Sequence, residues 1–375
     1  MKAIFAPTIF DGEQEHPEAV LLIDGDRILG MVPEPPPGVE VEELREGAML
    51  APGFIDLQVN GGGGVLLNHR VDVQAMAEIA AAHARVGTTT ILPTLISGTM
   101  AELRAALQAA RTALADGVPG IGGLHIEGPF LAMARRGIHP KAHITTPDDA
   151  DIAMLCAGFP GPLLLTLAPD VVPVAMITRL VDAGVIVFAG HTDGDYETML
   201  AGLDAGISGF THLYSAMSPL TVRAPGAVGA ALVDPRPRAG IIVDTIHVHP
   251  AAVRLAFNAM GPERLFLVSD AMCTAASDLD RFMLYDVEIS LRDGRLTDAA
   301  GTLAGAHLTM AEAVINMVKS VGCRREDALR MATATPADAV GFTDRGRIAP
   351  GMRADLVALD DSLQVIDVWQ GGVRV

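Results

Sequence analysis

The amino-acid sequence predicts an α/β protein, a (β/α)8 TIM-like barrel with a small β-sandwich domain formed by the two chain ends. In the central part, short apolar runs alternate with stretches rich in Ala, Leu and Met, as in a barrel of parallel strands and helices. Both ends instead show short strand patterns without a helical period. The length of 375 residues and the hydrophobic fraction of 50% allow one large core and a small companion domain.

The predicted β domain combines residues 1–51 with residues 343–375. In its C-terminal half, strand patterns occur at 351–359 and 365–375, and no helical stretch separates them. We expect the two chain ends to pair into one sheet. Residues 52–342 then form a barrel domain inserted between them.

Eight apolar runs of strand length occur in the central part. They are 54–59, 88–93, 121–127, 163–168, 185–191, 209–212, 240–244 and 265–270. The helical stretches between them are 73–86, 100–115, 174–183, 196–205 and 250–260. This alternation favours a barrel over a doubly wound open sheet, because no GxGxxG pattern follows the first strand.

The end of the central part departs from this alternation. Residues 271–306 interrupt it, with a hairpin-like turn at 292–295, and we expect either a lid or an additional β-ribbon. Two further helices are expected at 309–321 and 326–334. Thr335-Pro336-Ala337 marks the predicted end of the second.

Polar residues recur at the carboxyl ends of the predicted strands, where barrel enzymes carry their chemistry. They are Gln58, Asn60, Glu127, His191, His212, Asp244, His247 and Asp270. A single histidine at a strand end is more often a hydrogen-bonded core residue. A buried carboxylate such as Glu127 needs a cation, which is either a basic side chain or a metal. The recurrence of such residues at successive strand ends favours a metal.

Composition excludes several classes of partner. The formal net charge of −18 and the absence of a basic stripe argue against nucleic acid. No uncharged apolar run approaches the ~20 residues that span a bilayer, and the N-terminus lacks the apolar core of a signal peptide, so we expect a cytoplasmic protein without a membrane partner. Cys156, Cys273 and Cys323 follow no CxxC spacing, and we expect reduced thiols rather than disulfides or a cysteine zinc site.

Glu127, His191 and His212 are the kind of ligand set that binds a catalytic zinc, with three protein ligands and a fourth position for water. Water at such a metal becomes far more acidic, and Asp270 beside it would take its proton and pass it to a leaving group. The pattern therefore predicts hydrolysis of an amide, an ester or a related bond.

One metal is favoured over two. Many metal-dependent barrel hydrolases carry His-x-His on the first strand, and binuclear types often add a Lys at the end of the fourth. Here the first strand ends in Gln58-Val59-Asn60, and the run 163–168 contains no Lys. Amide side chains are poor ligands beside imidazole, so a second metal would lack donors.

Several motifs together resemble the N-acetylglucosamine-6-phosphate deacetylases, a family of the amidohydrolase superfamily. They are Pro52-Gly53-Phe54-Ile55-Asp56-Leu57-Gln58-Val59-Asn60-Gly61, His125-Ile126-Glu127-Gly128-Pro129-Phe130, Ala189-Gly190-His191-Thr192, Thr211-His212-Leu213-Tyr214-Ser215-Ala216-Met217 and Val268-Ser269-Asp270-Ala271. The resemblance covers nearly the whole chain in the right order, including the split β domain. Each motif alone is weak, whereas the set is specific.

This resemblance implies a site and a reaction. The metal would be bound by Glu127, His191 and His212, with Asp270 as general base and then acid. His139 would hydrogen-bond the acetyl carbonyl. The implied substrate contacts are Arg223 and His247 at the phosphate and the backbone around Ser215 and Ala216 at the sugar. Gln58 and Asn60 match the single-metal branch of the family.

The implied reaction is hydrolysis of the acetamide of N-acetyl-D-glucosamine 6-phosphate, a small amino-sugar phosphate, to D-glucosamine 6-phosphate and acetate. One divalent metal per subunit is implied, with Zn favoured over Fe, Co or Mn. The resemblance also implies a homodimer in which Arg223 or His247 reaches the neighbouring site. A concentrated local cation is needed, because a chain of this net charge repels a sugar phosphate.

The sequence departs from the family at Ser215, where Asn is usual, at Thr245, where Gly is usual, and in residues 273–286, which lack the usual glycine-bearing pattern. All three departures lie where the sugar and the phosphate would bind, so they affect the identity of the sugar more than the expected reaction. The alternatives are therefore N-acetylgalactosamine 6-phosphate, another N-acyl substrate of a single-metal amidohydrolase, or a non-catalytic scaffold. Rival phosphate or substrate contacts, ranked lower, are His249, Arg135, Arg136 and Lys141.

Overall fold

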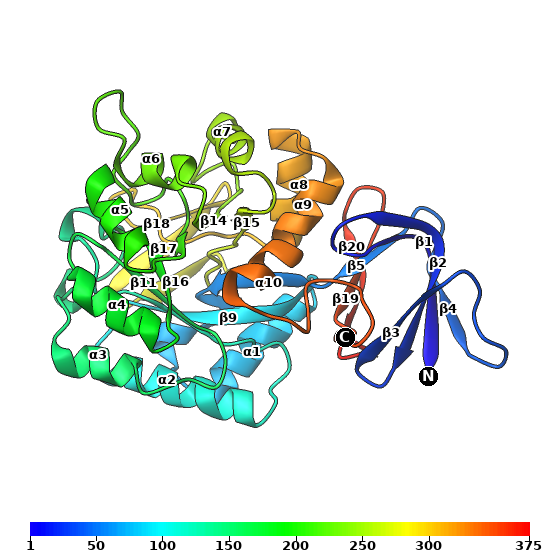
Figure 1. The fold of residues 1–375 in the computed structure, drawn as a ribbon. Coiled ribbons are helices and arrows are strands. Elements are labelled where there is room, and N and C mark those ends of the chain that lie inside the picture. Colours follow the sequence, from blue (N-terminus) through cyan, green and yellow to red (C-terminus); the bar gives the residue numbers. More distant parts are fainter.

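Eight parallel strands form a nearly closed barrel in the computed structural model, which describes residues Met1–Val375 (Figure 1). In chain order they are β6 (Phe54–Val59), β9 (Thr88–Ile96), β10 (Leu124–Glu127), β11 (Leu163–Leu167), β12 (Ile186–Ala189), β13 (Gly209–Phe210), β14 (Arg238–Ile241) and β15 (Leu265–Leu267). Each strand pairs in parallel with the strand that follows it in this series. The predicted barrel is confirmed.

Several predicted strands end earlier than the sequence pattern indicates. The backbone of His191, His212 and Asp270 has φ of 48°, 34° and 51°, which lies in the left-handed region and cannot continue a strand. These three residues therefore form the first turn after β12, β13 and β15 rather than the last position of the strand. β14 is displaced toward the N-terminus and stops before Asp244.

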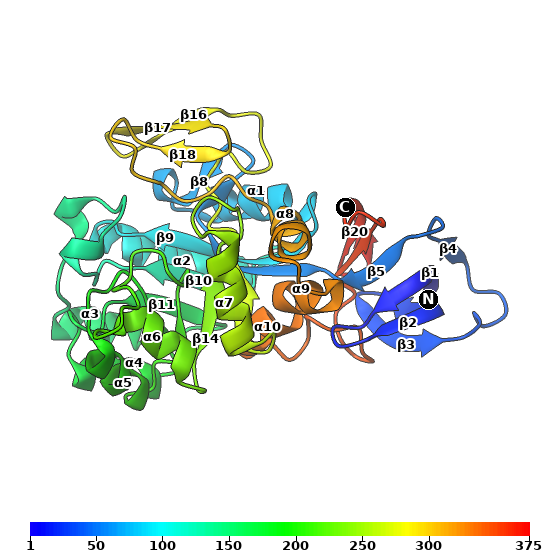
Figure 2. The ribbon, with the colours of Figure 1, turned by 90° about the horizontal axis from the view of Figure 1, so that it is seen from above.

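Helices flank the barrel strands on the outside (Figures 1 and 2). They are α1 (Val73–Ala84), α2 (Met100–Ala115), α3 (Asp149–Leu155), α4 (Val174–Asp182), α5 (Tyr196–Asp204), α6 (Gly226–Val233), α7 (Pro250–Met260), α8 (Met310–Asn316), α9 (Arg325–Ala332) and α10 (Ala334–Val340). Short helical turns occur at Leu67–His69, Met133–Arg135 and Lys141–His143, and a π-helical turn at Met317–Val321 extends α8.

Three helices, α3, α6 and α10, were not predicted, and the last predicted helix ends two residues earlier than expected, because α9 stops at Ala332. α6 is buried along nearly its whole length, so its apolar sequence has no polar face to give a helical period. α3 is short and begins with an Asp148–Asp151 capping box. Thr335-Pro336-Ala337 does not end a helix. It lies in the first turn of α10, where the missing N–H of proline breaks no helical hydrogen bond.

Both chain ends join one mixed sheet beside the barrel, where Figure 2 places the two termini. Its strands are β1 (Lys2–Phe10), β2 (Glu15–Asp24), β3 (Arg27–Val32), β4 (Val41–Glu43), β5 (Met49–Pro52), β19 (Leu356–Leu359), β20 (Val365–Gln370) and β21 (Val373–Arg374). The two ends meet where β5 pairs with β1 on one side and β19 on the other. This confirms that the ends form a sheet of their own, and the exact domain limits stay a prediction.

Two apolar cores support these layers. A cluster of 15 buried residues lies in the sheet of the chain ends and includes Trp369, which is fully buried. The main cluster of 79 residues fills the barrel and its helix layer. Val357 and Val368, from β19 and β20, belong to that main cluster, so the sheet also packs against the barrel. No helix is both long and apolar enough to cross a membrane.

The interruption after β15 is an antiparallel ribbon, which confirms one of the two predicted alternatives. It consists of β16 (Arg281–Leu284), β17 (Val287–Arg292) and β18 (Arg295–Thr297), and the Arg292↔Arg295 pair closes the predicted turn. A small hairpin of β7 (Gly61–Gly62) and β8 (Val65–Leu66) precedes α1. An apolar cluster that includes Leu66 and Phe282 joins the two hairpins over one end of the barrel (Figure 2).

The barrel closes between its first and last strands through a buried carboxylate. Asp56, on β6, is fully buried and accepts hydrogen bonds from the Ser269 N–H (3.2 Å), the Ser269 hydroxyl and the Gln58 N–H (3.1 Å). Beyond it, the Asp270 N–H donates to the Gln58 carbonyl at 3.0 Å and the Asn60 N–H donates to the Ala271 carbonyl at 2.9 Å. Asp56 thus supplements a backbone ladder that is reduced here to the Val59↔Ala271 bridge.

Replacing Asp56 with Ala should destabilise the protein by about 2–3 kcal/mol, because the Ser269 and Gln58 donors would be left buried and unpaired. Asp56→Asn keeps one carbonyl acceptor and should lose less. Urea unfolding followed by circular dichroism measures the difference, with exposed Asp182→Ala as the control. An Asp56→Ala protein that unfolds at the same urea concentration as the control would contradict this role.

Candidate active site

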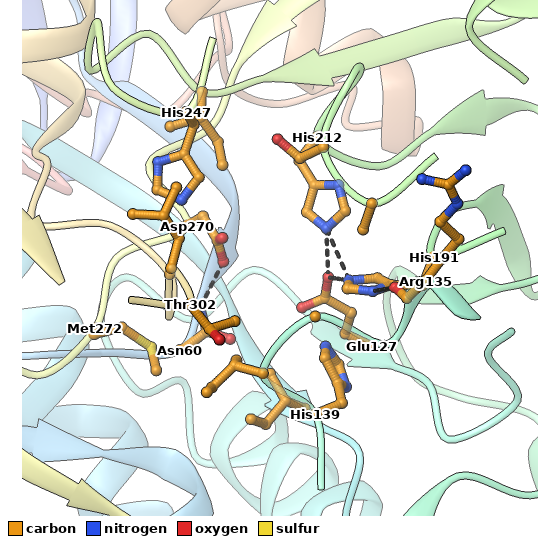
Figure 3. Close-up of a pocket in the computed structure, with 18 of the residues that line it drawn as sticks. Asn60, Glu127, Arg135, His139, His191, His212, His247, Asp270, Met272 and Thr302 are labelled. Atoms are coloured by element: carbon orange, nitrogen blue, oxygen red, sulfur yellow. Dashed lines mark hydrogen bonds and ion pairs between the residues drawn. The ribbon is translucent and has the colours of Figure 1, made fainter. Parts of the chain in front are cut away.

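A pocket of about 400 Å³ opens at the carboxyl ends of the barrel strands (Figure 3). It brings together most of the side chains that the sequence singled out. Those lining it are Asn60, Glu127, His139, His191, His212, Ser215, Ala216, His247 and Asp270. Gln58 lies just below, hydrogen-bonded to two of them. Arg223 lies outside.

Three ligand atoms converge at the bottom of this pocket. Oε1 of Glu127, at the end of β10, lies 3.1 Å from Nε2 of His191 and 3.0 Å from Nε2 of His212. The two imidazole nitrogens are themselves 3.0 Å apart. Each of these three residues is at most 5% exposed to solvent, so no bulk water reaches the space between their ligand atoms. The left-handed turns after β12 and β13 aim both imidazoles at the carboxylate.

This donor set fits a divalent cation. The Nδ1–H of His191 donates to the Arg135 carbonyl at 2.8 Å, so a neutral His191 points its Nε2 lone pair at the carboxylate. Lone pairs of a carboxylate and an imidazole at 3.1 Å repel unless a proton or a cation lies between them. Nitrogen and oxygen ligands of this kind suit zinc and similar metals.

The charges of these groups agree with that interpretation. Burial alone would raise the pKa of Glu127, but the hydrogen bonds and charges of His191 and His212 hold it well below its ordinary value. Burial lowers the pKa of His212, and Glu127 outweighs this effect and raises it. The carboxylate of Glu127 therefore favours a proton on His212. A metal would take the place of that proton.

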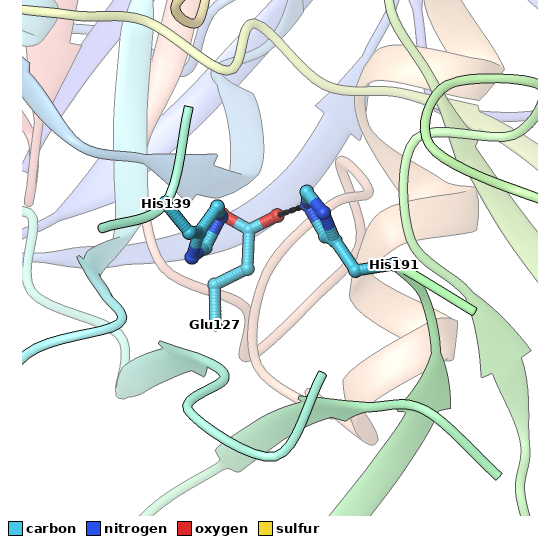
Figure 4. Close-up of side chains that lie close together, drawn as sticks. All are labelled: Glu127, His139 and His191. Atoms are coloured by element: carbon cyan, nitrogen blue, oxygen red, sulfur yellow. Dashed lines mark hydrogen bonds and ion pairs between the residues drawn. The ribbon is translucent and has the colours of Figure 1, made fainter. Parts of the chain in front are cut away.

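His139 also lies close to Glu127 and His191, with ligand atoms of the three residues within 4.8 Å (Figure 4). Its Nδ1, however, accepts the backbone N–H of Ser97 at 3.2 Å. A backbone N–H can only donate, so the proton of the neutral ring is on Nε2. Burial, with a further contribution from His191, lowers the pKa of His139 to about 3, which keeps the ring neutral. His139 is therefore a hydrogen-bond donor, and His212 is the better third ligand.

Asp270 lies beside the ligand set and is oriented by two amides. Its Oδ1 accepts from Nδ2 of Asn60 at 2.7 Å and from Nε2 of Gln58 at 3.2 Å. The same Gln58 amide donates to Glu127 at 3.1 Å. Burial and the charge of Glu127 raise the pKa of Asp270 to about 6, although His212, His247 and Asn60 lower it. Such a carboxylate can exchange a proton near neutral pH.

His247 faces the pocket from the loop after β14 and is held by Asp244. Its Nδ1–H donates to Asp244 at 2.6 Å, and the other carboxylate oxygen accepts the N–H groups of Ile246 and His247 at 2.8 Å. Thr245, between them, has φ of 65°, which explains why glycine would suit this position. Nε2 of His247 is left to meet a ligand.

The structure reverses the order in which the sequence ranked Arg223 and Arg135 as residues of the pocket. Arg223 is exposed on the loop before α6 and does not line the pocket of its own chain. Arg135, which was ranked lower, does line it and forms an ion pair with Asp193 at 2.7 Å. The only feature of the sequence that indicates a pocket position for Arg135 is its short distance from His139 along the chain.

Pocket residues from the segment after β15 were missed. Met272, Thr302, Leu303 and Gly305 complete the wall opposite Glu127, with Met272 and Thr302 labelled in Figure 3. None of these residue types indicates a catalytic or binding role by itself. They reach the site only because of the position of the segment after β15 in the folded chain. The segment was nevertheless identified as a possible cover.

Comparison with known proteins agrees with this geometry. The Amidohydrolase family model matches residues 49–375. An N-acetylgalactosamine-6-phosphate deacetylase of Shewanella sp. (strain ANA-3) is 42% identical over 329 residues, 88% of this chain and 83% of that protein. An N-acetylglucosamine-6-phosphate deacetylase of Haemophilus influenzae is 34% identical and covers 94% of this chain and 93% of its own.

Among solved structures, N-acetylglucosamine-6-phosphate deacetylase from Pasteurella multocida superposes with a TM-score of 0.96 at 33% identity. The match covers 100% of this chain and 99% of that one. The resemblance inferred from the motifs is thereby confirmed. The chain belongs to the amidohydrolase family.

Proposed function

We propose that this protein hydrolyses the acetamide of an N-acetylhexosamine 6-phosphate, with N-acetyl-D-glucosamine 6-phosphate as the main candidate, to give the free amino sugar and acetate. The observation that carries this proposal is the arrangement at the bottom of the pocket. Glu127, His191 and His212 meet within 3.1 Å, and Asp270 and His139 flank them. Metal ligands, a proton carrier and a neutral donor are what amide hydrolysis requires.

Glu127, His191 and His212 would hold one divalent metal per subunit, with Zn favoured and Fe, Co or Mn possible for the same ligands. A metal at that position acidifies water and polarises the amide carbonyl. Gln58 and Asn60 donate amide hydrogens toward the carboxylates, and their neutral amide oxygens are weaker ligands than imidazole, so a second ion would lack strong donors.

Asp270 is the proposed base and acid. It takes a proton from the attacking water and delivers it to the amide nitrogen as the C–N bond breaks. His139 donates its Nε2–H to the acetyl oxygen, where negative charge develops in the transition state. Both side chains are buried, so their hydrogen bonds act in a medium of low dielectric constant.

His247 and Arg223 are the proposed phosphate contacts. His247 lines the pocket, whereas Arg223 sits on a loop with Leu220 and Val222, which are exposed although apolar. A second copy of the chain that covers this loop would bury both apolar residues and bring Arg223 to the partner's pocket. We therefore propose a homodimer. A cytoplasmic location remains a prediction from the sequence.

N-acetylgalactosamine 6-phosphate is the second candidate substrate. The relative from Shewanella, which is 42% identical, carries that activity in its name. Ser215, which differs from the residue usual in the glucosamine enzymes, lines the pocket where a sugar would lie. The two epimers differ in the orientation of one hydroxyl group, so the preference for one substrate depends on contacts such as that of Ser215.

Acetate release should be fastest with N-acetylglucosamine 6-phosphate or its galactosamine epimer and at least about 100-fold slower with unphosphorylated N-acetylglucosamine, since charge-assisted contacts to phosphate contribute about 1.5–3 kcal/mol each. The measurement is kcat/KM for all three compounds with metal-replete protein. Equal turnover of the unphosphorylated sugar would refute the roles of Arg223 and His247. No turnover of any compound would refute the proposed reaction.

Asp270→Asn should keep the bound metal and lose about 100- to 10,000-fold in kcat, because the amide cannot carry the proton. Metal content by mass spectrometry and kcat from acetate release are the two measurements. Asp234→Asn serves as a matched control, since it changes a buried carboxylate that does not line the pocket. Full activity in Asp270→Asn would exclude this residue as the base.

Activity should fall as the pH is lowered, because Asp270 must be ionised to accept a proton. Burial and Glu127 raise its pKa to about 6, and the charge of a bound cation lowers it again, so the acidic limb of kcat/KM should have its midpoint at pH 6 or below. A pH profile between 4.5 and 9, corrected for metal loss, tests this. A midpoint well above 6 would assign the limb to another group.

A further inference from the structure

The proposed donor His139 depends on one peptide group for its protonation pattern. Ser97, directly after β9, is buried and donates its N–H to Nδ1 of His139 at 3.2 Å, with its hydroxyl oxygen 2.8 Å from the same atom. As long as this contact holds, the ring proton is on Nε2, which faces the pocket. If the Ser97 peptide rotated, Nδ1 could take the proton and the donor toward the substrate would be lost.

The antiparallel ribbon holds the backbone on both sides of this peptide group, which consists of the Ile96 carbonyl and the Ser97 N–H. The hydroxyl of Tyr285 donates to the Ser97 carbonyl at 3.2 Å and accepts from Nδ2 of Asn68 at 3.0 Å. Asn68 in turn pairs with both backbone groups of Ile96, at 3.1 and 3.2 Å, and its bond to the Ile96 carbonyl fixes the peptide group that carries the Ser97 N–H. A continuous set of hydrogen bonds therefore runs from the ribbon to the ring of His139.

The backbone conformation of Tyr285 is unfavourable in free energy for a residue other than glycine. This tyrosine is the first residue of the two-residue turn between β16 and β17, which the Leu284↔Val287 pair closes, and its φ is 52°. Asn, Asp or Gly is preferred there, because other side chains are strained in the left-handed region. Gly98 leaves room for its hydroxyl, since a Cβ at that position would lie 3.1 Å from Oη. Turn formation alone does not call for tyrosine.

We propose that Tyr285 is a positioning residue for the deacetylation: by anchoring both the Asn68 amide, which holds the Ile96 carbonyl, and the Ser97 carbonyl, it keeps the Ser97 N–H on Nδ1 of His139 and so presents Nε2–H to the substrate carbonyl. This inference rests on the proposed function. It also gives the ribbon a defined part in the reaction, since the ribbon supplies the hydroxyl that orders the pocket wall.

The test is a double-mutant cycle between Tyr285→Phe and His139→Ala. Phenylalanine keeps the ring, whose centroid lies 5.1 Å from that of His143, and removes only the hydroxyl. We expect Tyr285→Phe to lower kcat about 10-fold with KM and metal content unchanged, less than the ~100-fold or greater loss for removing the donor itself. In the His139→Ala background, Tyr285→Phe should have no further effect. Tyr196→Phe, a half-buried tyrosine outside the pocket, is the control.

A tautomer measurement adds a readout that does not depend on turnover. In ¹⁵N-histidine-labelled protein, the His139 signal, assigned by its loss in His139→Ala, should show protonated Nε2 and unprotonated Nδ1. Tyr285→Phe should introduce the second tautomer.

Three results would overturn the inference: Tyr285→Phe as active as Tyr196→Phe, a 10-fold loss that persists in the His139→Ala background, or a proton on Nδ1 in the unmodified protein. If the unmodified protein had no deacetylase activity, the proposed function would be refuted instead. The tautomer measurement would still show whether Tyr285 keeps the proton on Nε2 of His139.

Discussion

The site depends on how the barrel closes. Between β6 and the chain after β15 the ladder is reduced to one bridge, and the buried carboxylate of Asp56 completes the closure by accepting both the N–H and the hydroxyl of Ser269. This contact sets the position of the next residue, Asp270, relative to Gln58 on β6. The Asp270 carboxylate, just after the last strand, and amide donors from the first strand therefore meet beside Glu127. Stability and site geometry rest here on the same hydrogen bonds.

Two buried carboxylates share this small space, and their surroundings drive their pKa values apart. Two imidazoles hold the pKa of Glu127 well below its usual value, whereas burial and the Glu127 charge raise that of Asp270 to about 6. One carboxylate thus stays charged and can bind a cation, while the other can gain and lose a proton near neutral pH. Gln58 donates to both and separates them without adding a charge or a metal ligand.

Much of the fold, and the convergence of the strand-end side chains in one pocket, could be predicted, because period, length and strand-end chemistry are local signals. β6, α2 and α7 begin and end where the sequence pattern indicates. α6 has no polar face, so its sequence contains no amphipathic period to detect. Strand ends were overestimated because His191, His212 and Asp270 turn the backbone into the left-handed region, which apolar runs do not reveal.

Contacts between distant segments could not be predicted in this way. The sequence indicated a cover at residues 271–306 but not that Tyr285 meets Ser97, 188 positions away. It also ranked Arg223 above Arg135, although only the second lines the pocket of its own chain. Both outcomes depend on how loops pack over the barrel face. Residue type alone carries no information about that packing.

Left-handed residues gather around the pocket, and this distribution has a physical reason. His191, His212, Ala216, Thr245, Asp270 and Tyr285 all have positive φ without being glycine. Each costs free energy, and the packed barrel below compensates through strands that are almost entirely buried. A backbone held in such conformations by its neighbours has few alternatives of similar energy. The proposed ligands, the proposed base and the proposed anchor of His139 are therefore ordered before a substrate arrives, which lowers the cost of reaching a transition state.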